Sequence, residues 1–99
     1  MIDNEKTIEV VQIADMYLAA AVMSYGAELL GIDRTDPRKQ KFSFKNTIEK
    51  VYLLKDGLVQ TVEKPSFADL ERYSFNRVLM GHPAYADALK KVKSALHSV

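Results

Sequence analysis

The sequence contains no cysteine and only two histidines. Without cysteine the chain can form neither disulfide bonds nor thiolate metal sites, which suits a reducing compartment. His82 lies in a Gly-His-Pro turn and His97 close to the C-terminus, and neither has a second ligand at metal-binding spacing. We therefore expect no metal site and no cofactor.

Long apolar runs are also missing, because the longest one, over residues 16–23, is far too short to cross a bilayer. The acidic beginning of the chain is the opposite of the basic region of a signal peptide. The composition, 47% hydrophobic and 27% charged, is that of an ordinary globular domain, and 99 residues are enough for one core. These features predict a single domain over residues 1–99 that works in the cytoplasm and not at a membrane.

Patterns that mark catalytic sites are absent too. The four glycines bracket a strand, occupy a turn or end a helix, and none belongs to a loop that could hold a phosphate. No strained turn presents a serine as a nucleophile. We therefore expect no catalytic residues and a function other than that of an enzyme.

The most informative stretch that the sequence does contain is residues 15–25. Helix-forming residues dominate it, Asp15 can cap its start, and Gly26 can end it. Apart from Ser24, the side chains of this stretch after Asp15 are apolar or aromatic around the whole helix. Such a helix has to be covered on both sides, by strands on one side and by later helices or a second copy of the chain on the other.

This helix also supplies the candidate interface. If later helices cover only part of it, the remainder forms an exposed patch, which is typical of a protein-binding surface. The alternative is that the helices predicted over residues 67–80 and 84–98 complete its burial within one chain. The patch would consist of Tyr17, Ala21, Ser24 and Tyr25. It favours a protein that associates with another protein, most simply with itself as a homodimer or larger species.

The neighbouring segments predict a small antiparallel sheet. Residues 7–13 are rich in β-branched side chains and form the first expected strand. Residues 28–34 and 41–45 are two further strands, joined as a hairpin by a loop that contains Pro37. The side chains expected to face the helix are Leu30, Ile32, Phe42 and Phe44. The fold class is therefore α+β, with a β-α-β-β core packed on the helix over 15–25 and two or three helices after it.

Residues 46–64 are ambiguous. Asn46 and Glu49 have the spacing of a capping box, and apolar residues follow at helical intervals, so we favour a helix over residues 47–55. The dipeptide Asp56-Gly57 between two apolar runs is also a strong hairpin signal, and a hairpin remains the rival interpretation.

The charges are distributed unevenly. Residues 1–33 carry six acidic side chains and one basic one, whereas residues 34–99 carry seven acidic and thirteen basic ones. The basic side could meet an acidic partner, and the alternative function is nucleic-acid binding through phosphate contacts. Its candidate residues are Arg34, Arg38, Lys39, Lys41, Lys45, Lys90, Lys91 and Lys93.

The chain resembles a small uncharacterised domain family of bacterial and phage genomes. The matching motifs are Asp15-Met16-Tyr17-Leu18-Ala19-Ala20, Gly26-Ala27-Glu28-Leu29-Leu30-Gly31-Ile32, Phe42-Ser43-Phe44 and the C-terminal stretch over residues 85–96. The resemblance implies a compact α+β domain, with residues 46–64 as an insertion, and supplies no catalytic residues.

The first helix is also similar to the LAGLIDADG helix of homing endonucleases. In that family an acidic residue just before the terminal glycine holds the metal ion. Tyr25 occupies this place here and cannot act as a carboxylate ligand, so metal-dependent cleavage is not expected.

Overall fold

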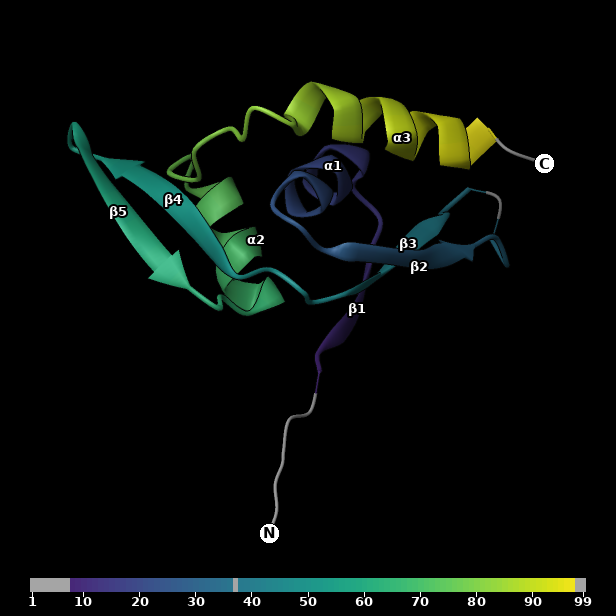
Figure 1. The fold of residues 1–99 in the computed structure, drawn as a ribbon. Coiled ribbons are helices and arrows are strands. Elements are labelled where there is room, and N and C mark those ends of the chain that lie inside the picture. The colour runs from purple at the N-terminus through teal and green to yellow at the C-terminus, as the bar shows by residue number, and fades with distance from the viewer. Residues whose placement is uncertain (1–7, 37, 98–99) are drawn as a thin grey trace, which may run out of the picture.

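The computed structural model describes residues 8–36 and 38–97, which fold into a three-stranded sheet, a separate hairpin and three helices (Figure 1). In chain order the elements are β1 (Val10–Ile13), α1 (Met16–Ser24), β2 (Glu28–Asp33), β3 (Lys41–Lys45), β4 (Lys50–Lys55), β5 (Leu58–Glu63), α2 (Phe67–Phe75) and α3 (Tyr85–His97). The fold is α+β, as the sequence predicts.

The three-stranded sheet is antiparallel, with β3 between β1 and β2. Phe42 and Phe44 of β3 are buried, and they lie opposite Ile13 and Val11 of β1 on the same face. The strand predicted over residues 7–13 is observed only from Val10 onward, while Thr7 lies outside the described residues.

The prediction that Leu30 faces the first helix is wrong. A β-bulge between Leu29 and Gly31 adds one residue to β2, so that Leu29 pairs with Phe44 and packs on the core. Leu30 is the extra residue and is 51% exposed. Ile32 lies beyond the bulge, packs against the core and matches the prediction.

Helix α1 lies between the sheet and α3, which forms the outermost layer in Figure 1. The Asp15 carboxylate caps it by accepting hydrogen bonds from the N–H groups of Tyr17 (2.8 Å) and Leu18 (3.3 Å). After the helix, Gly26 has a φ of +112° that favours glycine. The expected covering of α1 on all sides is incomplete within one chain, because Tyr17 is 59% exposed. The fully buried side chains of α1 are Ala19, Ala20 and Val22.

The prediction of a helix over residues 47–55 is wrong. The alternative prediction, a hairpin, is confirmed, and its strands are β4 and β5. Asp56 and Gly57 have φ values of 53° and 78°, as a two-residue type I′ turn requires. Asn46 does not cap a helix. Its side-chain oxygen instead accepts from the Ile48 N–H two residues later, which is an Asx turn.

Helix α2 is shorter than the sequence predicts over residues 67–80. Its start is confirmed by a capping box, but Arg77 adopts a left-handed φ of 59° and the helix cannot continue. Residues 78–80 then run along the free side of β4, where the Leu54 N–H donates to the Val78 carbonyl (2.8 Å).

Helix α3 agrees with the predicted helix over residues 84–98, although Ser98 lies outside the described residues. Ala88 and Val92 are buried, and Tyr85, Leu89 and Leu96 pack against the same core, so one side of the helix is apolar and covered. Among the helices in the described part of the chain, none combines the length and the apolar character needed to span a bilayer.

Candidate interaction surfaces

The four predicted interface residues lie together. Tyr17, Ala21, Ser24 and Tyr25 of the α1 segment line one hollow of about 190 Å³, whose other wall comes from the segment leading into α3. Helical spacing was therefore sufficient to group these four residues. The hollow could not be predicted from that spacing, because its other wall comes from a segment distant in sequence.

Two hydroxyl groups of this hollow donate hydrogen bonds within the chain itself. The Tyr25 hydroxyl donates to the Met80 carbonyl (2.5 Å), and the Ser24 hydroxyl donates to the Ala21 carbonyl (2.6 Å). Partial burial raises the pKa of Tyr25 above its ordinary value. The hollow is thus a small depression with several aromatic side chains, and among its large apolar side chains only Tyr17 is widely exposed.

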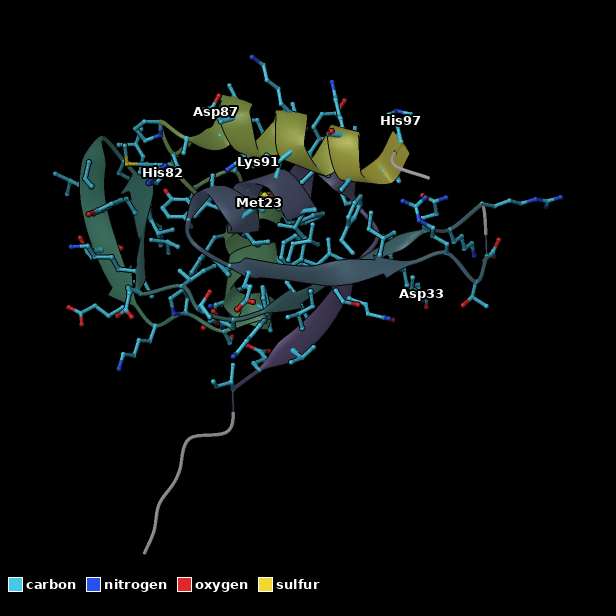
Figure 2. The ribbon with its side chains drawn as sticks, turned by 45° about the vertical axis from the view of Figure 1, so that its right-hand side comes forward. Met23, Asp33, His82, Asp87, Lys91 and His97 are labelled. Atoms are coloured by element: carbon cyan, nitrogen blue, oxygen red, sulfur yellow. The ribbon has the colours of Figure 1, made fainter. Side chains whose placement is uncertain are left out.

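His82 forms part of the same hollow. Its ring meets that of Tyr25 edge to face, with centroids 5.1 Å apart, and its Nδ1 accepts a hydrogen bond from the Ala84 N–H (2.9 Å). Figure 2 shows His82 and His97 at opposite ends of the layer that contains α3. Within residues 8–36 and 38–97, no three acidic or histidine side chains are close enough to hold a metal ion.

The structure distributes the eight predicted nucleic-acid residues over separate surfaces. Lys90, Lys91 and Lys93 are exposed on α3, whereas Lys41 and Lys45 lie on the face of the sheet that points away from α1. Figure 2 shows Lys91 on α3 and Asp33 on the sheet, with the helix that carries Met23 between the two layers.

Several of these basic side chains also have acidic or backbone neighbours. Lys41 and Lys45 lie directly across from Asp33 and Glu28 of β2. The guanidinium of Arg34 donates to two carbonyls in the last turn of α3, those of Ala95 (2.7 Å) and Leu96 (3.2 Å). Arg38 and Lys39 are exposed in the loop between β2 and β3. Binding of nucleic acid stays a prediction that this arrangement does not favour.

A larger hollow of about 450 Å³ lies between β1, α1 and α2 and is lined mainly by apolar side chains. Two of the carboxylates that line it accept hydrogen bonds from backbone N–H groups. Glu9 accepts from the Phe67 N–H at the start of α2 (3.0 Å), and Asp15 caps α1. These two groups therefore hold the helices in place rather than forming a pair of free acids.

A group of exposed apolar side chains lies on the hairpin of β4 and β5, at positions that the sequence did not indicate as an interface. Three apolar side chains near its tip are exposed: Leu54 by 48%, Leu58 by 67% and Val59 by 59%. Every residue of β5 except the half-buried Val62 is exposed. The Asp56-Gly57 signal predicts the hairpin, but its position at the edge of the molecule depends on contacts distant in sequence.

One side of this hairpin is occupied and the other is open. Residues 78–80 lie along β4, where the Met80 N–H donates to the Tyr52 carbonyl (2.9 Å). Within the part of the chain that the structure describes, no strand pairs with the outer side of β5. We call this outer side, over residues 58–63, the β5 edge.

In the comparisons with known proteins, no family model, curated protein or solved structure matches this chain.

Proposed function

We propose that this chain is a non-enzymatic interaction module of the cytoplasm that associates with a second copy of itself. The observation that carries the proposal is the β5 edge together with the exposed apolar side chains beside it. An open strand edge offers unpaired N–H and C=O groups to another strand, and exposed apolar groups gain free energy when a partner covers them.

The composition of the edge supports this proposal. Natural proteins protect open edges with charged residues, proline or bulges, because an unprotected edge pairs with other chains. Residues 58–62 of β5 are Leu, Val, Gln, Thr and Val, without a charge or a proline. The strand also pairs with β4 without a bulge. Up to Glu63 at its end, the edge therefore lacks the features that keep strands apart.

The hollow on α1 is the second candidate surface for association. It contains the sequence-predicted residues Tyr17, Ala21, Ser24 and Tyr25, but the hydroxyl of Tyr25 is already bonded within the same chain. A substitution in each surface distinguishes them. Val59→Lys places a charge beside the β5 edge, and Ala21→Glu places one in the hollow.

Light scattering over a range of protein concentrations measures the outcome. We expect the chain to associate beyond its monomer mass of 11.2 kDa, and Val59→Lys to return it to that mass. Leu30→Lys is the matched control, because Leu30 is a similarly exposed apolar strand residue away from the hairpin. Dissociation by Ala21→Glu alone would assign the interface to α1, and a monomer at every concentration would refute self-association.

The nucleic-acid alternative has its own test. It requires retention of DNA or RNA that weakens with salt and is abolished by charge reversal at Arg38, Lys39 and Lys41. Absence of retention at low salt would end this alternative.

A further inference from the structure

We propose that two copies of the chain join their β5 edges as antiparallel neighbours, with the two Gln60 residues facing each other at the two-fold axis. This inference rests on the proposed self-association and specifies its geometry. The two hairpins would then form one continuous sheet across the dimer.

The hairpin register determines which backbone groups are free. The turn at Asp56 and Gly57 closes on the pair Lys55 and Leu58, so alternate residues of β5, at positions 58, 60 and 62, bond to β4. The N–H and C=O groups of Val59, Thr61 and Glu63 consequently point outward. The same alternation is seen on the other side of β4, where Leu54 and Tyr52 bond to residues 78–80.

The side chains of β5 are arranged so that an antiparallel second copy of the strand is complementary to the first. A two-fold dimer requires a self-complementary surface, in which each contact occurs twice. With Gln60 on the axis, Leu58 lies across from the partner's Val62, and Val59 lies across from the partner's Thr61. Both are pairs of apolar or β-branched side chains, the kinds that stabilise neighbouring strands.

The side chains next to β5 extend this match. Leu54 pairs with Val59, and Tyr52 pairs with Thr61, within each hairpin. One exposed row across the dimer would therefore contain Leu54, Val59, the partner's Thr61 and the partner's Tyr52. Leu54 and Val59 of this row are exposed in the single chain, and Tyr52 is half-buried.

The charges at the ends of the strand favour the same register. With Gln60 on the axis, Asp56 in the turn lies nearest to the partner's Lys64, which brings opposite charges together. The neighbouring register, centred on Thr61, would instead place Val59 across from the partner's Glu63 and Leu58 across from the partner's Lys64. This alternative sets charged side chains against apolar ones.

A single cysteine tests the register, because the natural chain has none. Gln60→Cys would place two cysteines in a non-hydrogen-bonded pair, whose Cα atoms are about 4.5 Å apart. This separation allows a disulfide. In the same register, the two cysteines of Thr61→Cys are offset by two residues, or about 7 Å along the strand. This separation is too long for a disulfide without movement of the backbone.

The experiment compares Gln60→Cys, Thr61→Cys and an exposed control on α3, Ser94→Cys, by non-reducing electrophoresis after mild oxidation. We expect most of the Gln60→Cys chain to become a covalent dimer that reductant reverses, with little dimer from the other two. A covalent dimer from Thr61→Cys instead would overturn the register.

Light scattering on the natural chain separates the two levels of the proposal. If the natural chain is a dimer but Gln60→Cys does not cross-link, the paired-edge geometry is wrong while self-association stands. If the natural chain is a monomer at all concentrations, the proposed function fails as well. Random collision would cross-link Ser94→Cys as readily as Gln60→Cys, and that result would also refute the geometry.

Discussion

The Glu9 carboxylate accepts a hydrogen bond from the backbone N–H of Phe67 at 3.0 Å, which links the start of β1 to the first turn of α2. The same carboxylate oxygen accepts from the side-chain amide of Asn46 at 3.1 Å. A single side chain thus connects the sheet, the segment before the hairpin and a helix N-terminus, where a negative charge is favourable.

We therefore expect Glu9→Ala to lower the free energy of unfolding by about 1 kcal/mol, the usual effect of losing a helix cap. Urea denaturation measures the change. Glu9→Gln keeps an acceptor oxygen and should retain part of the stability. Coincident denaturation curves for Glu9→Ala and the natural chain would contradict this role.

Arg34 has a similar structural role at the other end of the molecule. Since its guanidinium binds the carbonyls of Ala95 and Leu96, Arg34→Ala should cost about 1 kcal/mol. It should also speed amide exchange in the last turn of α3. Arg38→Ala, in the same loop, is the control and should change stability by less than about 0.5 kcal/mol. Equal effects of the two substitutions would argue against the contact with α3.

The turn of the hairpin gives a third prediction. Gly57 has a φ of +78°, so Gly57→Ala should destabilise the chain by about 1 kcal/mol. It should also weaken association, because the β5 edge depends on this turn. Gly31→Ala is the matched control, since Gly31 lacks a positive φ and an added Cβ would meet no atom within 4 Å. Thermal unfolding and light scattering measure the two effects, and similar losses for both variants would contradict the prediction.

Acid should weaken the fold through Asp69. Hydrogen bonding with the Ser66 side chain, and then with its backbone N–H, lowers the pKa of Asp69 below its ordinary value of 3.8. A group with a lowered folded pKa contributes stability above its ordinary pKa and loses it as the pH falls through the folded value. Hydrogen bonds from Thr35 lower the pKa of Asp33 in the same way.

We expect the free energy of unfolding to decrease on acidification below about pH 4, the ordinary pKa range of aspartate. Asp69→Asn should remove part of this pH dependence, and Asp33→Asn another part. Denaturation at a series of pH values measures the slopes, which would remain unchanged in both variants if these carboxylates had no part in acid sensitivity.

Local signals were sufficient to place the strands of the three-stranded sheet and to bound α1. The alternation of Phe42 and Phe44 predicts β3, and the cap at Asp15 with the stop at Gly26 bounds the helix. The bulge at Leu30 could not be predicted, because the residue types of a strand do not show whether one of them is left unpaired. One unpaired residue shifts the alternation, so that Leu29 faces the core instead of Leu30.

Contacts distant in sequence decided the remaining elements. The apolar residues after Asn46 fit both a helix and a hairpin, and the structure uses the hairpin because β4 pairs with β5 on one side and with residues 78–80 on the other. The same pairing ends α2 early. Helical spacing grouped the residues around Ala21. The sequence could not show that the outer side of β5 is open, because this depends on which strands pair with the hairpin.

Amide hydrogen exchange at Thr61 tests the central claim most directly. In a single hairpin its N–H points outward and exchanges rapidly, whereas the Gln60 N–H is protected by β4. If two copies pair through the β5 edge, protection at Thr61 and Val59 should rise with protein concentration while that at Gln60 stays constant. Rapid exchange of Thr61 at every concentration would contradict the account.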